Sequence, residues 1–531
     1  MHASDGGATS HQSGRVAEGT VPVATSAAVD VRHPTGRRWR APVGLEHGLV
    51  PIAWVAAVGT ALAARPLLPV DETRYASVAW EMWRGGDYLV PHLNGAPYSD
   101  KPPLLFWLIV AGWRVLGPVE LWARLIGPAC GVASLALTAA LARRLWPERG
   151  LVSRVAPIML ASTMVWLVYS TLLLFDTVLT LCVMLAVIGL VDVRRGRRAG
   201  LGLVAIGIGF GVLAKGPVLL LHVLPAMVLA RWWDVRYDPP GGSPVSTRAR
   251  LRVSSLAVAG ATIAGIAIAL AWAIPAALVG GRAYASAIFI GQTAGRVVNS
   301  FAHRRPVWWY VPNLLWMLLP WLVWPAVWRS LRGDRWRDGL SSDEGLRLCT
   351  AIVVPAFIVF SVVSGKQVHY LLPEMPFLAL AMARLVARAS EADERVGRRV
   401  RWIAVGAFGV LALVSVVGAG TLRKRYDVRP VAAHLSSVEQ AGAPIAHEAR
   451  YSGQYTFLGR LRRPLAEIPT DSVAAWLAAH PSGRVVTYAR SPNAPGPGVP
   501  EFVHRLGNRF AVVRARVSFD RQGIPLGTER R

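Results

Sequence analysis

Apolar residues in this chain occur in long runs, separated by short stretches rich in Asp, Glu, Lys and Arg. Most runs are roughly 18–25 residues long, the length that a helix needs to cross a bilayer, so the pattern predicts an α-helical polytopic membrane protein with about eleven crossings. The predicted spans are residues 47–67, 120–143, 151–169, 172–192, 200–214, 217–231, 253–279, 307–329, 347–364, 371–388 and 401–421.

The connections between these spans differ in charge. Arginine clusters such as ARRLWPERG, VRRGRRAG and ADERVGRRVR fall on alternate connections, on the same side as the basic N-terminal segment RHPTGRRWR. Because cytoplasmic loops are enriched in Lys and Arg, this predicts a multi-pass protein of the inner (plasma) membrane whose other connections face the extracytoplasmic side. The apolar run 103–117 is short and leaves the number of spans between about 11 and 13.

Composition divides the chain into three parts. Residues 1–45 are rich in small and polar residues and lack the apolar core of a signal peptide, which predicts a disordered cytoplasmic tail. Residues 46–421 form the predicted membrane domain, with a first extracytoplasmic loop at 68–119. From residue 422 to 531 short strand-like segments and one helical segment predict a small soluble α/β domain on the outer side.

The composition also excludes some classes of function. A net charge of +27 could indicate a nucleic-acid partner, but the arginines are distributed over the loops of a chain that is 53% hydrophobic. Membrane lipids, and not nucleic acid, are therefore the expected partners. The three cysteines all lie within predicted spans, and their spacing indicates neither a disulfide framework nor a zinc site.

Charged residues are concentrated in the loop that follows the first span, DETRYASVAWEMWRGGDYLVPHLNGAPYSDKPP (71–103). Asp71 and Arg74 are three residues apart, which places them on one face of a helix. Apolar residues continue at helical intervals up to Gly85 and Gly86, where the helix is predicted to stop. This predicts an amphipathic helix along the membrane surface, whose charges either serve a site or only solvate it.

The end of the same loop favours a phosphate site. Lys101 precedes Pro102 and Pro103, and proline commonly starts a helix, so Lys101 is expected at a helix N-terminus where an anion is stabilised. Asp100 is placed to hold a cation or to orient the lysine. An acid and a base together suit a phosphate ester that is held while a hydroxyl group is activated.

Further ionisable candidates are predicted on the same side of the membrane. Asp176 interrupts an apolar run near its outer end, where a carboxylate is costly and indicates function unless it caps the span or pairs within the bundle. Arg296 lies in a long outer loop, and Tyr370 lies at the outer end of a predicted span. Lys215 and Lys366, two of only four lysines, lie beside Gly or Pro at the ends of apolar runs, where snorkelling is the alternative explanation.

The order of several motifs resembles the GT-C glycosyltransferases that use polyprenyl-phosphate sugars. The resemblance extends over residues 48–390 and is to the ArnT-like (aminoarabinose transferase) branch, which is related to the protein O-mannosyltransferases. It rests on DETRYA, PHLNGAPYSDKPPLLFW, LLFDTVLT, LAKGPV and KQVHYLLPEMPFLAL.

The resemblance implies a GT-C fold and roles for the candidates. Asp71 corresponds to the catalytic base or acceptor-orienting carboxylate, and Asp176 to a second acidic position near the metal or acceptor. The lipid phosphate would be bound by Arg74, Lys101, Arg296 and Tyr370, and we add Lys215 and Lys366 as candidate substrate-binding residues.

Two positions depart from the family. Asp100 stands where members often have Glu, so it is a shorter candidate ligand for a divalent metal ion, the one cofactor left open. Gly291 and Gln292 replace a Glu-His pair and put recognition of the acceptor in doubt.

The expected function is transfer of a sugar from a polyprenyl (undecaprenyl) phosphate carrier to an extracytoplasmic acceptor, such as lipid A or another cell-envelope glycan. A protein O-mannosyltransferase-like enzyme is an alternative within the same fold. A lipid or solute transporter is the alternative of another class; transporters tend to show internal repeats and broken helices at the midplane, whereas the charges here gather on one side.

Overall fold

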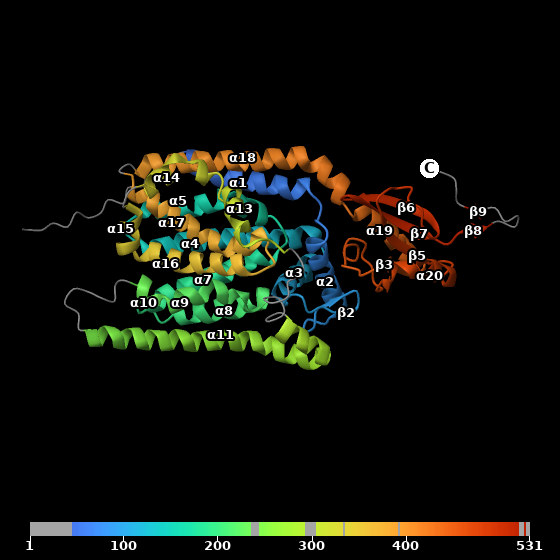
Figure 1. Cartoon of the computed structure of the whole chain (residues 1–531), viewed down its shortest axis with the longest axis horizontal. Helices are drawn as coiled ribbons and strands as arrows, with labels where there is room; N and C mark the ends of the chain where they lie inside the picture. The colour runs from blue at the N-terminus through green and yellow to red at the C-terminus, as the bar shows by residue number, and fades with distance from the viewer. Residues whose placement is uncertain are drawn as a thin grey trace, which may run out of the picture. The chain divides into compact units, whose positions relative to one another are not determined.

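The computed structural model describes residues 45–234, 244–291, 304–332, 335–390, 393–519 and 525–526. Nearly all of the predicted N-terminal tail lies outside these residues, so its disorder stays a prediction. Helices form most of the chain from α1 to α18, and a short antiparallel hairpin of β1 (His92–Leu93) and β2 (Ala96–Pro97) follows α2 (Figure 1). The helices are α1 (Leu45–Ala64), α2 (Asp71–Gly85), α3 (Leu104–Leu116), α4 (Glu120–Leu145), α5 (Gly150–Ser162), α6 (Met164–Tyr169), α7 (Phe175–Arg194), α8 (Gly200–Lys215), α9 (Leu219–Val228), α10 (Ala230–Trp233), α11 (Pro244–Ser286), α13 (Tyr310–Met317), α14 (Pro325–Leu331), α15 (Arg335–Ser342), α16 (Glu344–Val362), α17 (Met375–Arg388) and α18 (Asp393–Tyr426).

Seven helical segments within the described residues are long and apolar enough to cross a membrane. They are Glu120–Leu145, Phe175–Arg194, Gly200–Val228, Val253–Gly291, Glu344–Val362, Val368–Arg388 and Asp393–Gln440. Three shorter apolar helices are Gly48–Ala64, Leu104–Leu116 and Gly150–Ser162. The predicted class, a helical multi-pass membrane protein, is thus confirmed, while the count of 11 to 13 spans stays a prediction.

One predicted span differs from the structure. Residues 307–329 form short helical pieces, among them α13 and the start of α14, and not one continuous helix. Pro320 lies between these two helices and Pro325 starts α14. Proline lacks the N–H group that a continuing helix would donate, which explains the break.

Glycines allow α7 and α8 to approach each other closely. A Cβ atom at Gly207 would lie 2.6 Å from the backbone nitrogen of Ala186, and one at Gly189 would lie 2.6 Å from the carbonyl oxygen of Gly200. Any larger residue at these positions would push the helices apart. Small residues at helix crossings are typical of membrane bundles, and here they bring the end of α8 close to the start of α7.

A mixed sheet forms the C-terminal domain, as predicted (Figure 1). Its strand order is β4-β3-β5-β7-β6, in which β3 is parallel to β4 and β5, and β7 is antiparallel to β5 and β6. The elements are α19 (Arg429–Gln440), β3 (Ile445–Glu448), β4 (Ala466–Ile468), α20 (Val473–Ala479), β5 (Arg484–Ala489), β6 (Val499–Leu506) and β7 (Arg509–Ala515). The predicted boundary at residue 422 falls within α18, which continues to Tyr426.

The C-terminal domain is attached to α2 by buried contacts. The Ser77 hydroxyl group donates to the Gly453 carbonyl oxygen at 2.6 Å and accepts from the Phe457 N–H at 3.0 Å. The Phe457 ring stacks on Trp113 of α3, with 5.0 Å between ring centroids. The segment before β4 is therefore fixed on the helices that carry the candidate site.

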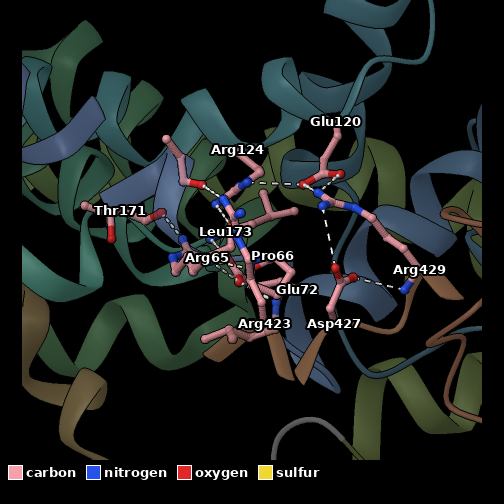
Figure 2. Close-up of polar contacts among 12 residues, drawn as sticks. Arg65, Pro66, Glu72, Glu120, Arg124, Thr171, Leu173, Arg423, Asp427 and Arg429 are labelled. Atoms are coloured by element: carbon pink, nitrogen blue, oxygen red, sulfur yellow. Dashed lines mark hydrogen bonds and ion pairs between the residues drawn. The ribbon is translucent and has the colours of Figure 1, made fainter. Parts of the chain in front are cut away.

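A second attachment consists of ion pairs (Figure 2). Glu120 at the start of α4 lies 2.9 Å from the Arg429 guanidinium of α19 and 3.2 Å from Arg124. Arg429 also lies 3.8 Å from Asp427. Because Arg429 is about half exposed, these pairs contribute little stability and chiefly orient the start of the domain.

Candidate active site

Asp71 begins α2, and the predicted helix ends as expected, because Gly86 adopts the left-handed conformation (φ 72°) that terminates it. The Asp71 carboxylate lies 3.7 Å from the Arg74 guanidinium, so the two residues share one face as predicted. The Asp71 side chain is 53% exposed. It is therefore accessible to a substrate and only weakly paired.

Glu72, next to Asp71, performs a role that sequence reasoning missed. Its side chain is buried, and its Oε1 accepts a hydrogen bond from the Leu173 N–H at 2.7 Å. Its Oε2 accepts from the Leu68 N–H at 2.8 Å and from Arg65 at 2.5 Å. The signal in the sequence is two consecutive acidic residues at a helix start, which does not reveal which of them is buried.

Arg65 completes this connection (Figure 2). In addition to Glu72, its guanidinium donates to the carbonyl oxygen of Thr171. The α1–α2 connection is thereby tied to residues 171–173, which lead directly into α7. Glu72 and Arg65 thus hold the two segments that position Asp71 and Asp176.

Asp176 lies in the first turn of α7 and is 2% exposed. Its Oδ1 forms an ion pair with Lys215 Nζ at 2.5 Å, and its Oδ2 lies 4.0 Å from His369 Nε2. Asp176 therefore pairs within the bundle with another candidate residue, Lys215, and its role in function stays a prediction.

Tyr370 joins the same cluster from a different segment. It lies in the 3₁₀ segment Val368–Glu374, and its ring centroid is 4.9 Å from Lys215 Nζ, a cation–π contact. The neighbouring His369 ring lies 5.6 Å from that of Tyr169. Three chain segments thus converge on the Asp176 carboxylate.

Lys101 lies just before α3, although the helix begins at Leu104 and not at the first proline. Its Nζ is 3.3 Å from the Asp100 carbonyl oxygen. The predicted Asn94-Gly95 turn that leads to it is present, with φ values of 55° and 77°.

Tyr98, which sequence reasoning did not select, is buried beside these residues. Burial raises the pKa of its hydroxyl group, and the negative charge of Asp100 adds to this effect while the Arg74 guanidinium opposes it. Tyr98 is therefore a neutral phenol whose O–H group remains available as a donor.

Not every candidate joins the cluster. Lys366 is buried, and its ammonium group donates to the carbonyl oxygens of Val363 at 2.5 Å and Arg305 at 3.1 Å. This contact holds one loop to another and does not reach Asp176. Arg296 lies outside the described residues, as does Gln292.

The possible metal site at Asp100 stays a prediction. Within the described ranges, no three His, Cys, Asp or Glu side chains come together as metal ligands. No chemical step is derived through a metal.

Comparisons with known proteins agree with the observed fold. Residues 100–237 match the family of dolichyl-phosphate-mannose-protein mannosyltransferases. The chain also resembles the crystal structure of ArnT from Cupriavidus metallidurans bound to undecaprenyl phosphate, with a TM-score of 0.68 and 18% sequence identity over 89% of this chain and 98% of that one. The chain has an ArnT-like fold.

Curated relatives are similar over the membrane region. The undecaprenyl phosphate-alpha-4-amino-4-deoxy-L-arabinose arabinosyl transferase of Aeromonas salmonicida is 29% identical over 359 residues, which cover 66% of this chain and 62% of the relative. A transferase of the same name from Sodalis glossinidius is 30% identical over 367 residues, or 67% of this chain and 61% of the relative. The matched regions span about three-fifths of these relatives. The predicted ArnT-like resemblance is confirmed.

Proposed function

We propose that the chain transfers a sugar from a polyprenyl-phosphate carrier to an acceptor on the extracytoplasmic face of the inner membrane. The observation that carries this proposal is an exposed carboxylate, Asp71, 3.7 Å from the Arg74 guanidinium, on a helix that Glu72 ties to the segment leading to Asp176. The ArnT-like fold and the relatives named as undecaprenyl-phosphate-dependent transferases support it.

The two carboxylates are suited to different tasks. Asp176 is buried and already neutralised by Lys215, which makes it a poor proton acceptor. Asp71 is half exposed, and its Arg74 partner is 3.7 Å away, so it can approach a hydroxyl group. Asp71 is therefore the proposed general base, and Asp176 positions Lys215 beside Tyr370.

In the proposed reaction, the acceptor oxygen attacks C1 of the sugar. The bond between C1 and the phosphate oxygen breaks, the new bond forms between C1 and the acceptor oxygen, and the acceptor proton passes to the Asp71 carboxylate. Negative charge develops on the departing phosphate, and Lys101 and Arg74 are the described cations placed to stabilise it. Arg296 is a further candidate for this role on sequence grounds.

The acceptor is the less constrained part of the proposal. Relatives named as aminoarabinosyl transferases favour a lipid A-like or other cell-envelope glycan. The match of residues 100–237 to the protein mannosyltransferases favours a protein hydroxyl group as the second candidate.

Transfer of radiolabelled sugar from a polyprenyl-phosphate donor by the purified full chain in detergent tests this function. We expect turnover by the wild type and its loss in Asp71→Asn and in Lys101→Ala. Matched controls are Asp471→Asn and Lys424→Ala, which change exposed residues of the same types. Both controls should keep full activity.

Three outcomes would oppose the proposal. Full activity of both site variants would remove the site assignment. Equal losses in the control variants would indicate a general charge effect. Movement of lipid across vesicles, without turnover of any lipid-linked sugar, would favour the transporter.

A further inference from the structure

A cavity of about 600 Å³ lies at the end of α7 that is remote from Asp176. Its walls come from the end of α4 with the turn after it, and from the end of α7 with the turn that leads to α8. The lining consists of Ala140, Arg143, Arg144, Pro147, Arg194, Arg195 and Arg197. Five of these seven residues are arginines, and none of the described lining residues is acidic, so the surface that faces the cavity is cationic.

Some of these arginines are held in place by one buried carboxylate. Asp192 Oδ1 accepts from Arg144 Nε at 2.9 Å and from Arg197 Nη1 at 3.0 Å. Asp192 is 5% exposed and does not itself line the cavity. Asp192 therefore joins the α4 and α7 sides of the wall and fixes the guanidinium groups of Arg144 and Arg197 at the edge of the cavity.

The remaining wall is anchored to other helices. The Arg194 guanidinium donates to the hydroxyl groups of Ser254 and Ser255 on α11, each at 3.1 Å. Arg195 lies 3.4 Å from the Glu344 carboxylate at the start of α16. Four of the five arginines are thus arranged by the fold before any ligand binds, which lowers the conformational entropy that binding would cost.

The position of the cavity fits a lipid headgroup. Arg194 follows Asp176 by 18 residues on one helix, which at the helical rise corresponds to about 27 Å. This distance is close to the hydrocarbon thickness of a bilayer, about 30 Å. The positive-inside rule explains why arginines are frequent at this end of the helices. It does not explain why arginines from two separate connections surround a single cavity.

We propose that this cavity binds the phosphate group of an anionic phospholipid in the membrane leaflet opposite the candidate active site. Guanidinium groups bind phosphate oxygens through paired N–H donors, and basic pockets between membrane helices accept such headgroups. The proposal is independent of the transferase activity, because it rests on residues at the other end of α7.

The test is lipid retention by the full chain. Protein purified in detergent is equilibrated with vesicles of equal parts phosphatidylglycerol and phosphatidylcholine, and bound lipid is counted by native mass spectrometry. We expect the wild type to select phosphatidylglycerol. Arg143→Gln and Arg197→Gln should each reduce this selectivity by about fivefold, the effect of one cation near a membrane surface.

Arg198→Gln is the matched control, because Arg198 is exposed, adjacent to Arg197 and absent from the lining. Unchanged selectivity in this control supports the proposal, whereas a loss equal to that of Arg197→Gln overturns it in favour of general surface charge. A wild type without selectivity also overturns it. Binding of inorganic phosphate by lipid-free protein, at concentrations that abolish lipid selectivity, would assign the cavity to a soluble phosphate and overturn the lipid assignment.

Discussion

The carboxylate of Asp176 and the ammonium group of Lys215 form a 2.5 Å ion pair between the first turn of α7 and the last residue of α8. Both side chains are largely buried, with exposures of 3% and 13%. The pair links two helices whose close approach is permitted by glycines, and it places Lys215 over the Tyr370 ring. The contact therefore joins the packing of two helices to residues of the proposed site.

Removal of the Lys215 ammonium group should destabilise the protein. Lys215→Met leaves Asp176 buried without its principal counterion, and breaking a buried pair in this way costs about 3–5 kcal/mol. We expect a lower thermal unfolding midpoint in detergent. The double variant Asp176→Asn with Lys215→Met removes both charges and should recover most of the stability without recovering sugar transfer. A Lys215→Met protein as stable as the wild type would contradict the buried pair.

Glu72→Gln should loosen the connection between α2 and the segment before α7. The amide keeps one acceptor oxygen, but it loses the negative charge that pairs with Arg65. It also loses one of the two hydrogen bonds from backbone N–H groups, and we expect the free energy of unfolding to fall by about 1–3 kcal/mol. Donor turnover should fall as well, because both carboxylate-bearing segments are released. Thermal unfolding and the transfer assay measure the two effects.

Glu81→Gln is the control for Glu72→Gln, since Glu81 is also on α2 and accepts from the backbone N–H groups of Asn94 and Gly95 at 2.7 and 3.0 Å. It supports the Asn94-Gly95 turn and not residues 171–173. If Glu81→Gln lowered turnover as much as Glu72→Gln, the specific role of Glu72 would be wrong.

The proposed roles of Asp71 and Lys101 separate kinetically. Loss of the general base in Asp71→Asn should lower kcat by about 10²- to 10⁴-fold with little change in the donor KM. Lys101→Ala should raise the donor KM as well as lower kcat, because in the proposed reaction this cation contacts the phosphate before and during its departure. Steady-state kinetics with varied donor concentration distinguish the two, and the same pattern in both variants would refute the assignment.

The C-terminal domain should lose stability in mild acid through His447. Burial lowers the pKa of this imidazole, while the Ala449 carbonyl oxygen and the carboxylates of Glu467 and Glu448 oppose the shift. The folded state thus prefers the neutral ring, in which Nδ1 donates to Ala449 and Nε2 faces the Tyr488 hydroxyl group at 3.0 Å. Since the unfolded state binds the proton more readily, stability is full above about pH 6.5 and declines as the pH falls below it.

Hydrogen exchange of β3 and β5 at pH 5 and pH 7.5 measures this effect. Wild type should exchange faster at pH 5 after correction for the intrinsic rate, and His447→Gln should show a smaller difference between the two pH values. His480→Gln, a change to a half-buried histidine stacked on Trp476, serves as the control and should keep the wild-type difference. An unchanged pH response in His447→Gln would assign the effect to other groups, such as His434, whose pKa is also lowered by burial.

Local features could be predicted from the sequence with good accuracy. Hydropathy and run length indicated the membrane class, because crossing a bilayer requires a continuous apolar surface. The start and stop of α2, the Asn94-Gly95 turn and the mixed C-terminal domain follow from preferences of neighbouring residues. The ordered motifs also indicated the ArnT-like fold that the comparisons confirm.

Contacts between distant segments could not be predicted in this way. Asp176 and Lys215 are 39 residues apart, and Glu72 and the Leu173 N–H are 101 residues apart. Lys215 and Lys366 appear equivalent in the sequence, as both follow apolar runs beside glycine. Lys215 points to Asp176, whereas Lys366 holds the carbonyl oxygens of neighbouring loops.

The sequence by itself determined the class of protein, the limits of many elements and the set of ionisable residues available for chemistry. Only the tertiary structure decided which of those residues meet. The physical reason is that an apolar helix suits the membrane in any rotation about its own axis, so hydropathy does not determine which side chains face each other. The rotation is selected by close packing, such as the approach of α7 and α8 at Gly207, and by the need to pair each buried charge.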